Sequence, residues 1–187
     1  MTIRRWGVAA LLCLLGASTA AHELPANRLT LVLRDQTHLS LTYVVDYAEA
    51  LHQALAPKRA LREFILLYSA MQQGEFEAAL IKAHAQLIVG TRLTLPTGEM
   101  LATRNWQWPE PVRARALLQD RAMRMLVGGD DRAHDDPFEV RAEAASSRHI
   151  GSVSIRLPEE LGKVMVVSYQ PRQVWVEPRA APIALRF

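Results

Sequence analysis

The segment LTLVLRDQTHLSLTYVV, residues 29–45, decides the fold of this 187-residue chain. On either side of its polar centre, apolar residues alternate with mostly polar ones, as in strands that bury one face. An antiparallel pairing that matches apolar with apolar sets Leu33 opposite Leu39 and Leu29 opposite Tyr43. A slip of one residue would face the leucines with polar side chains, so the sequence predicts a β-hairpin in this register.

The same alternation returns in the last third of the chain. Five segments there are expected to be strands: 138–142, 153–157, 164–167, 174–176 and 183–187. The segment 164–167 is continuously apolar, which favours a strand covered on both faces. These strands and the first hairpin need a common core, so we expect them to belong to one sheet system.

A helical region, about residues 47–87, lies between the hairpin and these later strands. Asp46 followed by Glu49 matches a capping box, which predicts that the first helix begins there. Pro57 ends that helix or begins the next. Apolar residues then recur at helical spacing: Leu61, Phe64, Ile65, Tyr68 and Met71. A third helix is expected to give way to a strand near residue 87.

The segment that follows mixes extended and helical signals. Trp106 and Trp108 are expected on one face of an extended piece. The prolines of 109–111 predict the start of a short helix that ends at about Gln119. Within 123–127, apolar Met and Val residues occupy alternate positions, which predicts another strand.

Together these segments predict a mostly β chain of the α+β class. The expected architecture is a β-sandwich-like domain with a helical insertion at about 47–87. We expect a single domain over residues 22–187, because no repeat, low-complexity segment or long linker divides it. The composition, 50% apolar and 22% charged, is typical of one globular domain.

Residues 1–21 have the pattern of a secretory signal peptide. Arg4 and Arg5 precede the apolar stretch 7–16, and small residues fill positions 17–21. The apolar stretch is about half of the roughly 20 residues that a bilayer-spanning helix needs. We therefore expect export to the periplasm with cleavage between residues 19 and 22; an uncleaved N-terminal anchor is the alternative.

Loss of the leader also limits the chemistry of the mature chain. The single cysteine, Cys13, lies in the leader, so no disulfide and no thiol nucleophile is expected after cleavage. The leader carries two of the 22 basic residues and none of the 19 acidic ones. The mature chain is then nearly neutral, and a nucleic-acid partner is not expected.

His22 is the strongest candidate for a metal ligand. Cleavage after Ala21 would make His22 the first residue, so that its α-amine and imidazole could chelate one metal ion as a histidine brace. Cleavage one or two residues earlier would give Ala-His or Ala-Ala-His, and the latter can wrap Cu(II) in a square plane of nitrogens. The alternative is a histidine that follows a cleavage site by chance.

His52 is the best candidate for a second ligand. Continuing the hairpin register places position 22 opposite position 50, and His52 lies two residues beyond, in the first turns of the expected helix. The sequence thus gives a metal-site hypothesis of His22 with His52, for copper or another transition metal. The alternative reading of His52 is a solvated helix residue beside Gln53.

Other clusters favour ordinary structural roles. The acidic loop 130–136 lacks the Asp spacing and distal Glu of a calcium loop, so it is interpreted as solvated. Four arginines lie close to Trp106 and Trp108 and could bind an acidic polymer, although a solvated helix face is favoured: Arg113, Arg115, Arg121 and Arg124. No nucleophile-elbow, zinc-protease or P-loop motif occurs, so an enzyme is not expected.

Three features carry a resemblance to known families: the leader ending in Ala21-His22-Glu23, the amphipathic hairpin, and the segment PRQVW at 171–175. With these the chain resembles a group of uncharacterised exported proteobacterial proteins. It is also similar to the extracytoplasmic domain of HupE/UreJ-type proteins, which are thought to handle nickel or related metals. The resemblance implies an exported domain and favours metal binding. It implies no transport role, because no long apolar run follows the leader.

The sequence therefore predicts an exported, non-enzymatic accessory or binding module whose partner is another envelope protein. The alternative is a periplasmic copper- or transition-metal-binding protein that uses its mature N-terminal histidine.

Overall fold

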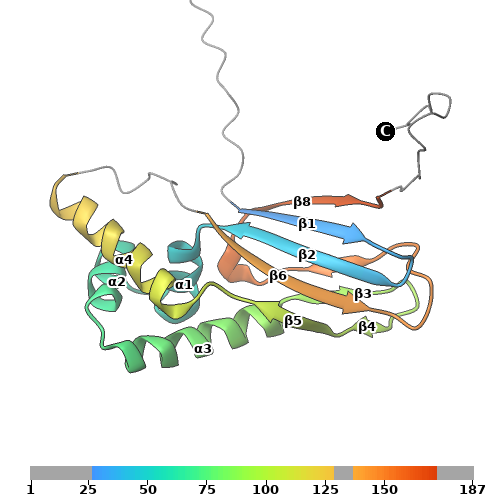
Figure 1. Ribbon diagram of the computed structural model, residues 1–187, viewed down its shortest axis with the longest axis horizontal. Coiled ribbons are helices and arrows are strands. Elements are labelled where there is room, and N and C mark those ends of the chain that lie inside the picture. Colours follow the sequence, from blue (N-terminus) through green and yellow to red (C-terminus); the bar gives the residue numbers. More distant parts are fainter. Residues whose placement is uncertain (1–26, 129–136, 172–187) are drawn as a thin grey trace, which may run out of the picture.

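The computed structural model describes residues 27–128 and 137–171. Four α-helices, eight strands and one short 3-10 helix follow one another in this range (Figure 1). Their bounds are β1 Asn27–Leu33, β2 His38–Val45, α1 Tyr47–Leu55, α2 Leu61–Ser69, α3 Gln73–Gly90, β3 Arg92–Thr94, β4 Met100–Leu101, β5 Thr103–Gln107, α4 Pro111–Leu126, β6 Phe138–Ala145, β7 Ser154–Arg156, η1 Glu159–Leu161 and β8 Val164–Tyr169.

The larger sheet has five strands in the order β5-β6-β2-β1-β8. It is mixed, because β8 runs parallel to β1 whereas the other neighbours are antiparallel. The predicted hairpin register is confirmed: Leu33 pairs with Leu39, and Leu29 pairs with Tyr43. The expectation that the hairpin shares one sheet with the later strands is confirmed for β6 and β8, which flank it, and is wrong for β7, which belongs to a second sheet.

A second, smaller sheet has three strands in the order β4-β3-β7. A turn over residues 96–99 joins β3 to β4, and the Leu95 amide donates to the Glu99 carbonyl at 2.9 Å. Gly98 in this turn has φ 86°, a left-handed conformation that glycine adopts without strain.

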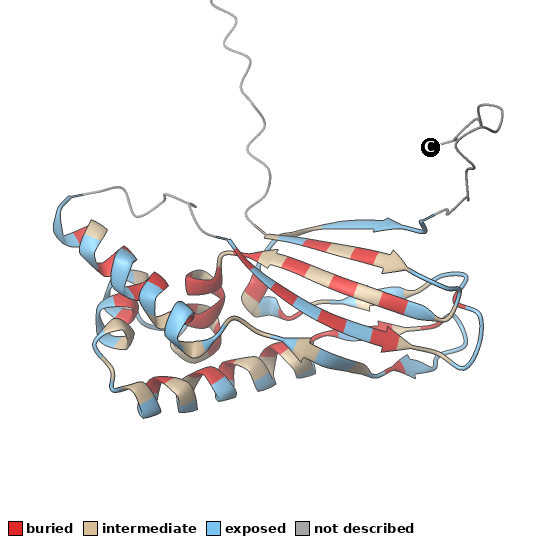
Figure 2. Ribbon diagram, viewed as in Figure 1, coloured by how far each residue is buried: buried red, intermediate tan, exposed pale blue. Residues whose placement is uncertain are grey.

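The core lies on the inner face of the larger sheet, where every second residue of β2 and β6 is buried (Figure 2). Apolar side chains of the helices and of the smaller sheet complete it, including Leu51, Phe64, Leu80, Leu93 and Leu118. Figure 1 shows α1, α2 and α4 together at one end of the larger sheet, while α3 runs from that end toward β3. The apolar faces of the helices are thus buried against the end of the sheet, where they complete the core.

The first helix begins as predicted. Asp46 is the N-cap of α1, and its carboxylate accepts the Glu49 amide at 3.1 Å. The third helix, however, continues to Gly90, so the transition to a strand near residue 87 is wrong. Leu87 remains buried at a helical interval from Leu80 and Ala83, and this spacing extends the helix by one further turn.

The strand predicted at 123–127 is also wrong, because α4 runs through it to Leu126. Its buried residues follow helical spacing without a break: Ala114, Leu117, Leu118, Arg121, Ala122 and Met125. The alternation of Met and Val at 123–127 is therefore coincidental, since Met123 and Val127 are exposed while Met125 is buried.

β8 does not have the double cover that its apolar sequence predicted. It lies at an edge of the larger sheet, and Val166, Val167 and Tyr169 are exposed. A continuously apolar run shows that a strand has two apolar faces, but its position in the sheet decides whether both are covered.

The α+β class with a mixed sheet is confirmed, whereas a β-sandwich is not shown by the residues that the structure describes. The strands predicted at 174–176 and 183–187 lie outside those residues, as do the leader and the acidic loop. Within 27–128 and 137–171, no helix is both long enough and apolar enough to cross a bilayer.

Candidate binding site

A row of stacked rings lies where β2 and β5 meet α3; we call Tyr43, Trp106, Trp108 and His84 the aromatic ladder. The Tyr43 and Trp106 ring centres are 5.9 Å apart, and those of Trp106 and Trp108 are 5.1 Å apart with planes within 7° of parallel. His84 stacks on Trp108 at 4.0 Å and 8°. Ring stacking of this kind stabilises the fold beyond the effect of burying the rings, and it fixes each ring in one orientation.

The two tryptophans lie on the same face, as their spacing of two residues predicted. The ladder between β5 and β6 is irregular between Arg104 and Gln107, and Asn105 has a φ of 53°. Such an irregularity re-aims side chains at the edge of a sheet. The Trp106 indole N–H donates to Thr103 Oγ1 at 3.2 Å, which fixes one end of the ring.

The Tyr43 hydroxyl bonds to Thr91, the residue that caps the C-terminus of α3. The Thr91 hydroxyl donates to the Leu87 carbonyl at 3.0 Å, so the Tyr43 hydroxyl donates to Thr91 Oγ1, 3.2 Å away. Burial raises the pKa of Tyr43 to about 12. Tyr43 is therefore a neutral donor at physiological pH.

His84 forms the other end of the ladder and bonds to Tyr47. The Tyr47 hydroxyl lies 2.5 Å from His84 Nε2, and burial raises the pKa of Tyr47. Burial also lowers the pKa of His84 to about 4. The hydroxyl of Tyr47 is thus the donor, His84 is neutral, and its single ring proton resides on Nδ1.

The pH dependence of stability should reveal this buried imidazole. The pKa of His84 falls from 6.5 to about 4 on folding, so the unfolded chain binds a proton in that window that the folded chain does not. The contribution of His84 to the free energy of unfolding is fully present above about pH 6.5 and is lost as the pH drops toward 4. Because the ring is only partly buried, we expect His84→Gln to reduce this loss by about 1–2 kcal/mol.

Urea unfolding of both proteins between pH 7 and 4 measures the difference in slope. His149→Gln is the control, since His149 is exposed. Parallel stability curves for the parent protein and His84→Gln would contradict the assignment.

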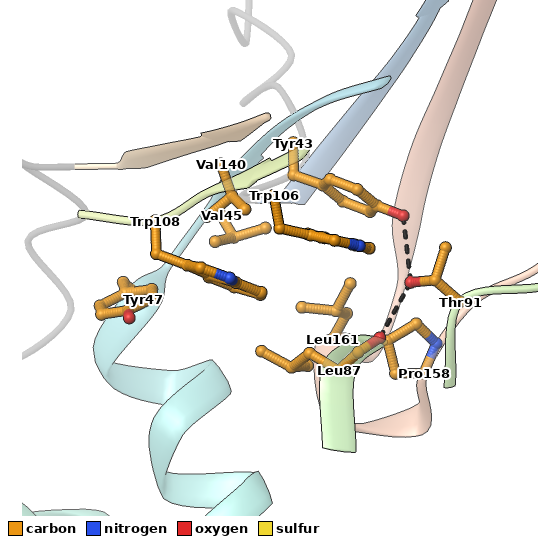
Figure 3. A pocket seen from close by; sticks show the side chains of 10 residues that line it. All are labelled: Tyr43, Val45, Tyr47, Leu87, Thr91, Trp106, Trp108, Val140, Pro158 and Leu161. Atoms are coloured by element: carbon orange, nitrogen blue, oxygen red, sulfur yellow. Dashed lines mark hydrogen bonds between the residues drawn. The ribbon is translucent and has the colours of Figure 1, made fainter. Parts of the chain in front are cut away.

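A narrow slot lies beneath the two tryptophans. Figure 3 shows Trp106 and Trp108 on one side and Leu87, Pro158 and Leu161 on the other. The slot also contacts Tyr43, Val45, Tyr47, Thr91 and Val140. The free space measures about 20 Å³, which is room for about one water molecule or methyl group. The slot can take the tip of an apolar group but not a whole ligand.

An open groove of about 500 Å³ borders Trp108; we call it the Trp108 groove. Trp108, Arg113 and Phe138 line it, together with Gln107, Pro109, Glu110, Pro137, Glu139 and Arg141. The Arg113 guanidinium lies over the Phe138 ring at 5.4 Å, a cation–π contact. Arg141 pairs with Glu139. The groove thus combines aromatic faces with charges that are largely balanced.

The arginine-rich stretch of α4 is not a free basic face. Arg121 is buried and pairs with Asp46 at 2.8 Å, so the interpretation as a solvated helix face is wrong for this residue. Arg115 Nη1 donates to Gln73 Oε1 at 3.3 Å. Arg113, in contrast, is exposed and lines the Trp108 groove.

The proposed metal ligands are only partly placed. His22 lies outside the described residues, and the pairing of β1 with β2 stops before position 50, since β2 ends at Val45. His52 is buried rather than solvated, and its Nε2–H donates to the Arg59 carbonyl at 2.7 Å. Its Nδ1 lies 3.4 Å from the Gln53 amide nitrogen and 3.8 Å from a Glu49 carboxylate oxygen.

Elsewhere in the described ranges, no group of three or more His, Cys, Asp or Glu side chains is arranged to hold a metal ion. The pairing of His22 with His52 stays a prediction.

Sequence reasoning found Trp106 and Trp108 but not His84, Tyr47 or the slot. His84 is 37 positions from Tyr47 and belongs to a helix that carries apolar residues on most sides, so its sequence context gave no signal. Searches of protein-family models, curated proteins and solved structures found no match for this chain.

Proposed function

We propose that this protein is an exported, non-enzymatic accessory module that binds another envelope protein through the Trp108 groove. The observation that supports the proposal is a partly exposed tryptophan, Trp108, held flat between His84 and Trp106 at the wall of an open groove. Protein interfaces concentrate their binding energy in Trp, Tyr and Arg side chains of this kind.

The rigidity of the aromatic ladder favours binding. An anchor that is already ordered loses little conformational freedom when a partner contacts it, so more of the contact energy appears as affinity. Arg113 is likewise ordered by its contact with Phe138. A partner side chain with an apolar tip would fit against Trp108, while the balanced charges of the groove rim would select its polar neighbours.

Site-specific photo-crosslinking in the envelope tests the proposal. A benzoylphenylalanine in place of Glu110, which lines the groove, should give a discrete adduct with one protein. Trp108→Ala in the same background should remove that adduct, because the anchor of the interface is gone. Val112→Ala is the matched control, since Val112 is an exposed apolar residue of α4 outside the groove lining.

A probe at Glu99, in the turn between β3 and β4, controls for nonspecific adducts. Equal adducts from Glu99 and Glu110, or an adduct that persists in Trp108→Ala, would overturn the assignment. Thermal unfolding of each variant establishes that loss of the adduct does not reflect loss of the fold.

The alternative proposal is a periplasmic copper-binding protein that uses His22 as its first mature residue. The leader pattern supports it, and so does the position of His52 Nδ1, which has only a long hydrogen bond of 3.4 Å from the Gln53 amide nitrogen to give up to a metal ion. Copper(II) favours nitrogen ligands in tetragonal geometry. The α-amine must lose its proton to bind, so affinity should rise between about pH 6 and 8.

Competition titration of the exported, cleaved protein tests this alternative. His22→Ala should abolish Cu(II) binding, whereas His149→Ala should leave it unchanged. N-terminal sequencing of the same material checks cleavage between residues 19 and 22. If His22→Ala binds copper as well as the parent protein does, the copper proposal is wrong.

A further inference from the structure

Two arginines lie directly opposite each other on the outer face of the smaller sheet. Arg92 of β3 pairs with Arg156 of β7 across the antiparallel ladder. Their neighbours Leu93 and Ile155, which are also paired, turn toward the core, so the two arginines point outward and are exposed. This places two exposed arginine side chains on one surface, at directly paired positions.

Like charges directly opposite each other in a sheet destabilise it. Among the residues that the structure describes, no carboxylate lies within the 4.0 Å ion-pair distance of Arg92, Arg156 or the nearby Lys82. The repulsion between the two arginines is therefore not compensated within the fold. A bound anion would compensate it.

The two arginines form one side of an open groove of about 850 Å³. Lys82 and Val89 of α3 border the same groove, and Glu159 and Glu160 lie on its wall as well. The next residue pair along the outer face of the sheet, Thr94 and Ser154, adds two hydroxyl donors beside the arginines. The groove thus carries three positive charges against two negative ones, and two hydroxyl groups lie beside its arginines on the outer face of the sheet.

We propose that Arg92 and Arg156 bind a phosphate group in this groove. A tetrahedral phosphate has enough acceptor oxygens to take paired N–H groups from both guanidiniums at once, whereas one carboxylate is filled by a single arginine fork. Lys82 contributes a third positive charge from α3. This site is separate from the Trp108 groove and does not depend on the function proposed for it.

The phosphate group has two possible sources, free phosphate and a phospholipid headgroup. Two exposed apolar side chains are available nearby: Val89 borders the groove, and Met100 lies outside the groove lining but is paired with Thr94 on the same face of the sheet. Both could rest against acyl chains if the headgroup is the ligand. The experiment therefore has one arm for each source.

In the first arm, inorganic phosphate is titrated into the protein by calorimetry in a phosphate-free buffer at low ionic strength. We expect saturable binding to the parent protein and a loss of affinity of about tenfold or more in Arg92→Gln and in Arg156→Gln. Arg92→Lys should also bind more weakly, since it keeps the charge but loses the fork. Arg28→Gln, which removes an exposed arginine of β1, is the matched control and should bind as the parent does.

In the second arm, sedimentation with phosphatidylglycerol vesicles is compared with sedimentation with phosphatidylcholine vesicles. Binding to the anionic vesicles that depends on Arg92 and Arg156, without saturable binding of inorganic phosphate, assigns the site to a headgroup. Removing one arginine also removes the repulsion, so both glutamine variants should melt no lower than the parent, and a loss of binding is then not a loss of fold.

The proposal is overturned if the parent protein binds neither inorganic phosphate nor anionic vesicles. It is also overturned if Arg28→Gln weakens binding as much as Arg92→Gln does.

Discussion

Asp46→Asn will lower the free energy of unfolding by about 3 kcal/mol, because it leaves Arg121 as a buried charge without its carboxylate. The Asp46 and Arg121 side chains are only 14% and 7% exposed, and the carboxylate lies 2.8 Å from Nη2. Asparagine also serves as an N-cap, so the hydrogen bond to the Glu49 amide is retained. The substitution therefore removes the negative charge but keeps the N-cap hydrogen bond.

A second variant separates the buried charge from the packing. In Asp46→Asn/Arg121→Met, no unpaired charge remains, and an apolar side chain of similar length fills the site. We expect this double variant to recover at least half of the lost stability, since a buried ion pair can be replaced by apolar residues at little cost. Urea unfolding measures both values. A double variant that is less stable than Asp46→Asn would contradict this account.

The effect should be large because Asp46 connects several elements. Its backbone amide donates to the Asn27 side-chain oxygen at 2.8 Å, and the Asn27 amide nitrogen donates to the Leu161 carbonyl at 2.6 Å. Through Arg121 the same residue contacts α4. The start of β1, the N-terminus of α1, η1 and α4 thus meet at one point, directly beside Tyr47.

Local patterns predicted those parts of the fold that depend on neighbouring residues. The hairpin register follows from alternation within 29–45, and the start of α1 follows from a cap three residues from its partner. Both interactions lie within a short stretch of chain, so the sequence shows both partners together.

The parts that the sequence did not predict depend on distant partners. Whether β8 is covered depends on its place at the edge of the sheet, and the continuation of α4 depends on the surface that buries Met125. The candidate site shows the same division. Trp106 and Trp108 were placed on one face by their spacing, whereas His84 joins them from α3 and is recognised only once the helix is placed.

Two glycines of α3 provide a matched pair for the last prediction. A Cβ built on Gly90 would lie 2.5 Å from Pro158 Cβ and 2.9 Å from Pro158 Cα, closer than such atoms approach in folded proteins. A Cβ on Gly74 would meet no atom within 4 Å. Both residues are within the same helix, and neither has a positive φ, so alanine is compatible with the backbone at both positions.

We therefore expect opposite effects on stability. Gly74→Ala should stabilise the fold by about 0.5 kcal/mol, because alanine restricts the unfolded chain and favours a helix. Gly90→Ala should destabilise it by about 2 kcal/mol, because the proline backbone must move to admit the methyl group. Pro158 and Leu161 form one side of the slot beneath the tryptophans, so Gly90→Ala should also change the fluorescence of Trp106 and Trp108, whereas Gly74→Ala should not.

Urea unfolding and tryptophan emission spectra measure these effects. Both are recorded in a Trp6→Phe/Trp175→Phe background, which leaves only the two ladder tryptophans in the chain. If Gly90→Ala is as stable as Gly74→Ala and leaves the spectrum unchanged, the close approach of α3 to Pro158 does not set the width of the slot. If Gly90→Ala is destabilised but the spectrum stays the same, the contact supports the fold without shaping the slot. The full prediction requires both changes, since the same proline packs against the C-terminal end of α3 and lines the slot.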